Sequence, residues 1–138
     1  MNIITVPDKR LLRVAEEVQQ GEDCRTLIDE MFQIIRGCGI GLAAPQLGVN
    51  KRIIVVNYNS TRYAIINPVL DPNTKIKARV VEEGCLSVPG KRVQVKRWRK
   101  VKVRGFDENW RPMTVGGKEY LAAVFQHEID HLNGIVIQ

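Results

Sequence analysis

Residues 127–131 read His-Glu-Ile-Asp-His, and this pattern constrains the fold more than any other feature of the chain. Two histidines four residues apart lie on one face of an α-helix, close enough to bind one metal ion, and a glutamate after the first can handle protons beside it. His127 and His131 are the only histidines in the chain. The motif therefore predicts a helix that carries a metal site.

This helix is expected to run from about 118 to 133 and to be buried. At about 100° per residue, the histidines share one side of the helix with Tyr120, Ala123 and Val124. The other side carries large apolar residues, namely Leu121, Phe125, Ile129 and Leu132. Because a helix that is apolar on nearly all sides is buried, strands are expected to surround it.

The rest of the chain predicts one more helix and several strands. Asp23 is expected to cap a helix whose apolar residues recur at helical spacing from 24 to 38. Apolar and β-branched runs predict strands at 52–57, 63–67 and 75–82. Together these elements predict an α+β fold with a central buried metal-binding helix, antiparallel β-strands around it and an N-terminal helix.

Two shorter features are interpreted as turns. Valines alternate with cations on both sides of Arg97-Trp98-Arg99, which predicts an antiparallel hairpin with Trp98 at its turn. Gly116-Gly117 is interpreted as a second turn.

Composition sets broad limits. A chain of 138 residues with 44% hydrophobic residues predicts a single globular domain over 1–138. No apolar run approaches the length of a membrane span, and the start lacks the pattern of a signal peptide, so we expect a cytosolic protein without membrane contact. An odd count of three cysteines favours free thiols or a metal ligand over a disulfide framework.

The third metal ligand is expected upstream, because residues 132–138 contain no Cys, His, Asp or Glu. Cys85 is the strongest candidate, since it follows a predicted strand and a glycine and precedes a Pro-Gly turn. Cys24 and Cys38 fall in or at the end of the first helix, where core packing is the better interpretation.

Residues 39–48 form a segment rich in small residues that is not a phosphate-binding loop, because no Lys-Ser/Thr pair ends it. One interpretation is a tight turn between helix and strand. The other is a strip of backbone that receives an extended ligand, with the amide of Gln46 beside it.

Three segments resemble the signature motifs of peptide deformylases in order, spacing and sequence: Gly39–Gly48, Glu83–Pro89 and Gln126–Gly134. The resemblance covers Pro7 to Ile137 and implies Cys85, His127 and His131 as metal ligands. It also implies Glu128 as the catalytic acid and base. Gln46 and the backbone N–H of Leu86 are implied as donors to the oxyanion.

The resemblance implies a metal-dependent hydrolase that removes the N-formyl group from the formylmethionine of new polypeptides and releases formate. The nucleophile is then a water molecule held by one divalent metal, for which ferrous iron is expected and zinc, nickel or cobalt are alternatives. The expected location is the cytoplasm, the compartment of bacterial-type translation.

Substrate contacts are expected from two sets of groups. An apolar pocket for the methionine side chain is expected from Ile40, Tyr120, Ala123 and Val124. Backbone groups for pairing with the peptide are expected from Ile40, Gly41 and Gly84. Arg92 matches a family arginine near Cys85 and is expected to support this loop.

Segment 91–104 is strongly basic, with eight cations and no acid: Lys91, Arg92, Lys96, Arg97, Arg99, Lys100, Lys102 and Arg104. As a basic hairpin with an aromatic residue, it predicts a weak contact with RNA or the ribosome; the alternative is an ordinary solvated sheet edge. Charge reversal at Arg97 and Arg99 is expected to reduce such a contact and to spare peptide turnover.

The chain is expected to be a monomer and a short form of the family without its C-terminal extension.

Two other functions fit parts of the sequence. The helical motif alone allows a metallopeptidase that cuts internal peptide bonds, but an upstream cysteine ligand argues against it. A non-enzymatic metal-stabilised binding protein would leave Glu128 and Gln46 without a role.

Overall fold

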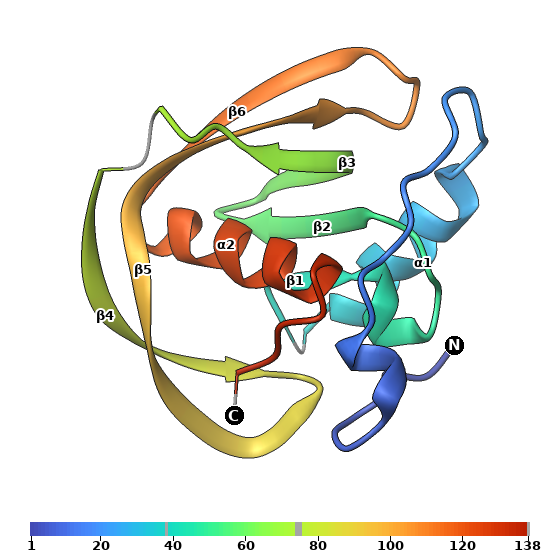
Figure 1. The fold of residues 1–138 in the computed structure, drawn as a ribbon. Coiled ribbons are helices and arrows are strands. Elements are labelled where there is room, and N and C mark those ends of the chain that lie inside the picture. The colour runs from blue at the N-terminus through green and yellow to red at the C-terminus, as the bar shows by residue number, and fades with distance from the viewer. Residues whose placement is uncertain (38, 74–75, 138) are drawn as a thin grey trace.

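The computed structural model describes residues 1–37, 39–73 and 76–137 and has an α+β fold, as expected. Two 3-10 helices, two α-helices and six strands follow one another along these residues (Figure 1). In chain order they are η1 (Lys9–Leu12), α1 (Arg25–Ile35), β1 (Gly41–Ala43), η2 (Ala44–Leu47), β2 (Ile53–Tyr58), β3 (Thr61–Leu70), β4 (Ile76–Cys85), β5 (Val88–Phe106), β6 (Pro112–Lys118) and α2 (Tyr120–Leu132).

All strand pairs are antiparallel, in the order β1-β2-β3-β5-β4, with β6 paired to the other side of β5. The first part of β5 pairs with β4 and its last part pairs with β3 and β6. Figure 1 shows β5 as a long strand that curves around α2. The sheet therefore wraps the helix that carries the histidine motif.

Strand β2 is buried on both faces, which explains its uninterrupted run of β-branched residues. Ile54 and Val56 pack with Phe125 and Ile129 of α2, while Ile53 and Val55 pack against α1 on the other side of the sheet. Because successive side chains of a strand point to opposite faces, one strand separates the two cores. Helix α2 is thereby fixed inside the curved sheet.

The predicted hairpin around Trp98 is wrong, because Val88–Phe106 is one continuous strand. Its alternation continues through the cations, so Arg97 takes an inward position on the same side as the buried Val101 and Val103. Gly116 and Gly117 are likewise not a turn but part of β6, where Gly117 packs against the ring of Phe125.

The N-terminal helix begins one residue later than expected. Cys24 is its N-cap residue and makes no capping side-chain hydrogen bond, although the carboxylate of Asp23 accepts from the backbone N–H of Arg25 at 3.1 Å. Cys24 is buried in the core as predicted, at 2% exposure. The packing predicted for Cys38 lies outside the described residues.

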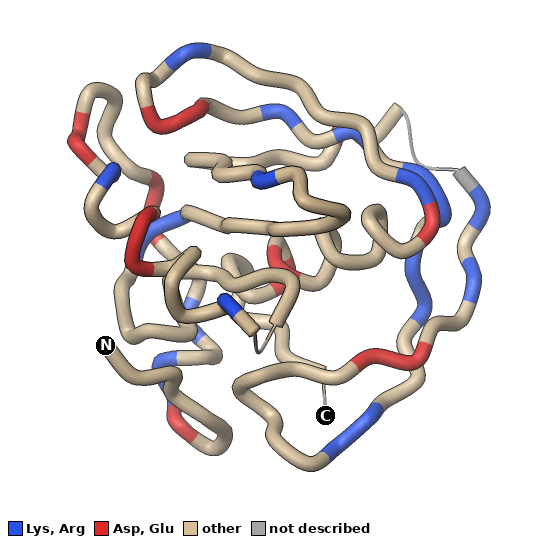
Figure 2. Tube along the Cα trace, turned by 180° about the vertical axis from the view of Figure 1, so that it is seen from behind, with Lys and Arg blue, Asp and Glu red and all other residues tan. Residues whose placement is uncertain are grey.

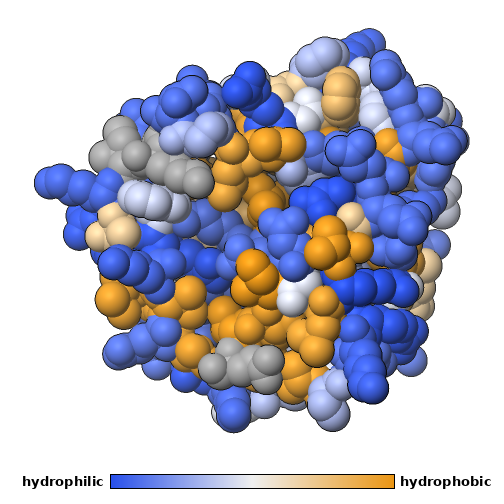
Figure 3. Space-filling view, in the orientation of Figure 1, coloured by the Kyte–Doolittle hydropathy of each residue, from blue (hydrophilic) through white to orange (hydrophobic). Residues whose placement is uncertain are grey.

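The chain after α2 packs against the segment that follows η1, where the N–H of Ala15 donates to the carbonyl of Leu132 at 2.8 Å. Leu12, Val14 and Ile135 nevertheless remain more than half exposed. Figure 3 shows apolar side chains gathered on the face where the chain ends.

Neither α-helix in the described part of the chain has the length and apolar character needed to cross a membrane.

Candidate active site

The two histidines and one cysteine meet where α2 passes the end of β4. His127 and His131 lie one helical turn apart on α2, and Cys85 is the last residue of β4. One ligand atom from each lies within 4.8 Å of the others, and Cys85 Sγ is 3.3 Å from His131 Nε2. The structure thus brings together the three residues that the sequence analysis proposed as ligands.

The donor set fits a divalent metal ion. In a tetrahedral site with a metal–sulfur distance of about 2.3 Å and a metal–nitrogen distance of about 2.0 Å, the two donor atoms are separated by about 3.5 Å. The observed 3.3 Å between Cys85 Sγ and His131 Nε2 is close to that separation. A thiolate and two imidazoles suit zinc, ferrous iron, nickel or cobalt, and three protein ligands leave one position for a reactant.

A buried network orients His127. Its Nδ1 lies 2.9 Å from Glu83 Oε1, which leaves Nε2 to face the other ligands. Arg97 donates two hydrogen bonds of 2.8 Å to the carboxylate of Glu83 and one of 2.6 Å to Asp130. Arg97 is only 6% exposed. The expectation that Arg97 is a cation of a basic surface hairpin is therefore wrong, and its charge reversal is no longer expected to spare peptide turnover.

Sequence reasoning missed Glu83 and Arg97 as parts of the site. Glu83 precedes Cys85 by two residues, so strand alternation places both side chains on the same face of β4. The two-residue repeat of a strand, counted back from Cys85, was therefore the sequence signal that could have identified Glu83 as part of the site. No local signal identifies Arg97, because its partners lie 14 and 33 residues away.

Burial and neighbouring charges separate the pKa values of these groups. Burial alone would raise the pKa of Glu83, but hydrogen bonds from Arg97 and His127 lower it to about 2. Burial lowers the pKa of His127, but hydrogen bonds with Cys85 and Glu83 raise it to about 10. Burial lowers the pKa of His131 to about 3. A metal must displace the proton that His127 holds, so metal affinity should fall at low pH.

Glu128 lines the same cavity as Cys85 and His127, and its carboxylate packs against Gly41. It is 4% exposed, and its Oε1 is buried without a hydrogen-bond partner among the described residues. Burial raises the pKa of Glu128 to about 7, although the nearby His127 acts in the opposite direction. A Cβ at Gly41 would lie 2.6 Å from Glu128 Oε2. Gly41 is therefore needed to make room for this carboxylate.

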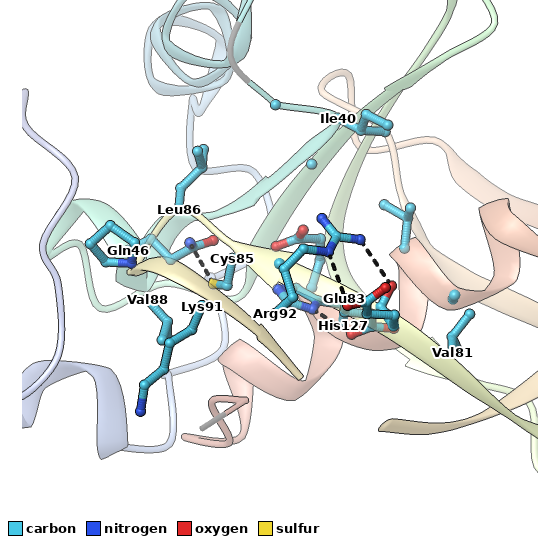
Figure 4. Close-up of a pocket in the computed structure, with 18 of the residues that line it drawn as sticks. Ile40, Gln46, Val81, Glu83, Cys85, Leu86, Val88, Lys91, Arg92 and His127 are labelled. Carbon is cyan, nitrogen blue, oxygen red and sulfur yellow. Dashed lines mark hydrogen bonds and ion pairs between the residues drawn. The ribbon is translucent and has the colours of Figure 1, made fainter. Parts of the chain in front are cut away.

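The side chain of Gln46 reaches the site from η2 and is 2% exposed. Its Oε1 accepts from the N–H of Ala43 at 2.9 Å, and its Nε2 donates to Ser87 Oγ at 3.1 Å. The same Nε2 lies 3.8 Å from Cys85 Sγ (Figure 4). The amide nitrogen of Gln46 therefore points toward the ligand cluster.

A cavity of about 500 Å³ opens beside the ligands. The residues expected to contact substrate all line it, namely Ile40, Gly41, Gly84, Arg92, Tyr120, Ala123 and Val124, as does Leu86 (Figure 4). Val81, Val88 and Lys91 also line it and were not anticipated. Arg92 bends over β4, where it contacts Glu82 and would lie 3.4 Å from a Cβ at Gly84. It therefore covers one wall of the cavity.

We expect Arg97→Ala to lower the free energy of unfolding by about 3–5 kcal/mol, because it leaves Glu83 without its buried cation. Arg99→Ala is the matched control. Arg99 is half exposed and 3.8 Å from Glu119, so its loss should cost at most about 1 kcal/mol. Urea unfolding of the two variants measures the difference, and equal losses would contradict a buried network at Arg97.

The chain matches known proteins along its whole length. The family model of polypeptide deformylases matches residues 1–138. Peptide deformylase 3 of Shewanella oneidensis is 39% identical over 141 residues, which cover 99% of this chain and 85% of that protein. Peptide deformylase of Pseudomonas aeruginosa is 40% identical over 139 residues, covering 97% and 82%.

Solved structures agree with these matches. The peptide deformylase of the Vibrio parahaemolyticus bacteriophage VP16T, crystallised with actinonin, superposes with a TM-score of 0.94 at 42% identity and covers 99% of this chain and 100% of its own. The peptide deformylase of Thermus thermophilus gives a TM-score of 0.92 at 35% identity, covering 98% and 81%.

Proposed function

This chain belongs to the peptide deformylase family and removes the N-formyl group from nascent polypeptides, and we propose that Glu128 carries the proton transfers of that reaction. The single observation that supports this role is the buried carboxylate of Glu128, one of whose oxygens has no protein partner among the described residues, beside Cys85, His127 and His131. These three residues would hold the metal.

Glu128, Gln46 and Leu86 have different roles in the proposed reaction. When bound, the metal acts as a Lewis acid that polarises the formyl oxygen and lowers the pKa of water. Glu128 accepts the proton of the attacking water and passes it to the leaving amine, a role that suits a carboxyl whose pKa is raised to about 7. The side-chain N–H of Gln46 and the backbone N–H of Leu86 donate to the negative charge that develops on the formyl oxygen.

Substrate is expected to lie between the two edges of the sheet. β1 and β4 are the ends of the strand order β1-β2-β3-β5-β4, and residues of both line the cavity. Backbone groups of Ile40, Gly41 and Gly84 would pair with the peptide as with an added strand. The methionine side chain would then enter between Ile40, Tyr120, Ala123 and Val124.

We propose ferrous iron as the physiological metal, because a thiolate and two imidazoles bind it well, although the same donors accept zinc, nickel or cobalt.

We further propose that residues 1–138 form a single catalytic domain, since one continuous sheet wraps α2 and the family match spans these residues. We also propose a cytoplasmic location, because formylated nascent chains are made in the compartment of bacterial-type translation, and we expect a monomer.

The test is release of formate from a formyl-Met-Ala peptide by protein prepared without oxygen and loaded with iron, nickel or zinc. We expect formate with at least one metal and no cleavage of an internal peptide bond in a non-formylated peptide of the same sequence. Cleavage of the second peptide would instead indicate a metallopeptidase, and no formate with any metal would contradict the proposal.

We also propose a contact with RNA through the solvent-facing side of β5 and β6, in place of the predicted hairpin. Strand alternation puts five cations on this side, here called the outer basic face: Lys96, Lys100, Lys102, Arg104 and Lys118. Lys100 pairs directly with Lys118 across the strands, and Trp98 lies between Lys96 and Lys100 with 39% exposure. Figure 2 shows Lys and Arg recurring along β4 and β5.

RNA fits this face better than an anionic membrane does. Its exposed valines, Val80 and Val69, pair with Lys96 and Arg104, eight residues apart on β5, so they lie about 26 Å from each other. They form no contiguous apolar patch for a bilayer. A row of cations beside an exposed aromatic ring instead suits phosphates and a stacked base.

Reversal of Lys100 and Lys102 to Glu should weaken ribosome co-sedimentation and lower its logarithmic salt slope by about 1.4–1.8, since each lost phosphate contact contributes about 0.7–0.9. Reversal of the exposed Lys9 and Arg36, which lie outside this face, changes the net charge equally and is the control. Formate release should be unchanged in both variants. Equal losses of co-sedimentation would indicate a general charge effect and refute the surface.

A further inference from the structure

Ser87 is completely buried, at 0% exposure, in the short turn between β4 and β5. It is not one of the three residues proposed to hold the metal, and it is not among the residues that line the cavity. Its hydroxyl oxygen accepts a hydrogen bond from Gln46 Nε2 at 3.1 Å. Ser87 thus contacts the proposed oxyanion donor from the side away from solvent.

The orientation of the Gln46 amide follows from its two partners. The backbone N–H of Ala43 can only donate, so the atom of Gln46 that meets it must be the oxygen Oε1. Nε2 then carries two hydrogens, of which one is directed to Ser87 Oγ and the other toward Cys85 Sγ, 3.8 Å away. The second hydrogen is the one available to a developing oxyanion.

This orientation needs support, because the terminal torsion of a glutamine has broad, nearly two-fold preferences. Rotation by half a turn would place Oε1 where Nε2 now lies. A carbonyl oxygen there would repel negative charge on the substrate instead of stabilising it. The N–H of Ala43 opposes that rotation, because it would then face the amide N–H groups. The hydroxyl of Ser87 binds the other end of the amide, so that one N–H is occupied and the plane of the amide is held in place.

The N-terminal segment ties the two residues together. The backbone N–H of Ile4 donates to the carbonyl of Gln46 at 2.7 Å, and that of Val6 donates to the carbonyl of Ser87 at 2.9 Å. The donors are two residues apart, so a single extended piece of chain spans η2 and the turn after β4. It fixes the separation between Gln46 and Ser87.

We propose that Ser87 is a positioning residue for deformylation: its hydroxyl, held in place by residues 4–6, keeps one Gln46 N–H directed at the reacting carbonyl. The proposal rests on the oxyanion role of Gln46 proposed above. Because Ser87 acts through Gln46, its effect must depend on the presence of the Gln46 amide.

A double-mutant cycle with Ser87→Ala and Gln46→Ala tests this dependence. Gln46→Ala should lower kcat by about 10²–10³-fold. Ser87→Ala should lower kcat by roughly 10-fold, with KM within about 2-fold and metal content per chain unchanged. In the Gln46→Ala background, Ser87→Ala should change kcat by less than about 2-fold.

The outcomes separate the two proposals. If Gln46→Ala leaves kcat unchanged, the oxyanion role fails. If Gln46→Ala is slow but Ser87→Ala lowers kcat equally in both backgrounds, or does not lower it at all, the positioning role is wrong.

A second pair of variants applies if Ser87→Ala does not fold. Ile4→Pro removes the backbone donor to Gln46, whereas Ile4→Ala keeps that donor and removes only side-chain atoms. We expect a lower kcat for Ile4→Pro alone, and no such loss in the Gln46→Ala background. Equal kcat for the two Ile4 variants would overturn the proposal.

Discussion

Cys85→Ala is expected to lose the metal and, with it, formate release. The side chain of Cys85 is one of three candidate ligands whose donor atoms lie within 4.8 Å of one another, and the other two are fixed to one helix. Changes in groups that merely orient a ligand cost about 10–100-fold in metal affinity, so removal of a ligand should cost more than about 100-fold. Metal content per chain after gel filtration, measured by elemental analysis, checks this directly.

Cys24→Ala is the matched control, because it removes the same atom from a buried site in the other core. Cys24 lies at the start of α1, away from the ligands, so this variant should retain one metal per chain and full activity. It should lose only packing energy, on the order of 1 kcal/mol. Equal loss of metal in both variants would contradict the ligand assignment.

The site helix was predictable because its signal is local. Two histidines four residues apart require helical geometry to share a metal, and the apolar residues on nearly every side of 120–132 indicate burial. Cys85 was predictable only as a candidate, since nothing in its own segment states that β4 ends beside α2. The likeness of three segments to one family, and not periodicity, supported that step.

The error at β5 has a physical cause. Arg97-Trp98-Arg99 interrupts a valine alternation, which favours a turn, yet the two-residue period continues through it with Arg97 facing inward. An inward arginine is stable only where carboxylates meet it, and here they come from Glu83 on β4 and Asp130 on α2. Those partners are distant in sequence, so the sequence alone could not distinguish a buried cation from a surface cation.

The same limit applies to Glu83 and Ser87. Both lie in a motif that pointed to Cys85, but their roles depend on His127 and Gln46, which are about 40 residues away. Burial of a polar side chain is the property that marks them, and burial follows from how β4, α2 and η2 come together. The candidate ligands were therefore accessible from sequence, whereas the groups that orient them required the fold.

Glu128→Gln is expected to lower kcat by about 10²–10⁴-fold, because the amide cannot accept the proton of water or return it to the amine. The substitution keeps the size of the side chain, so its packing against Gly41 should remain. Metal content should therefore be unchanged. Glu108→Gln, the same change in the exposed turn after β5, is the control and should leave kcat unchanged.

The pH dependence of stability gives an independent measurement on Glu128 in metal-free protein. Burial raises its pKa from 4.5 to about 7, so the folded state binds a proton more tightly than the unfolded state does. Its contribution to stability is complete below pH 4.5 and is lost as pH rises through 7, by up to roughly 3 kcal/mol for a shift of this size. Glu128→Gln has no such titration, so it should gain stability relative to wild type between pH 5 and 8, as urea unfolding would measure. A constant difference across that range would mean that Glu128 is not the buried, proton-binding carboxyl that its catalytic role requires.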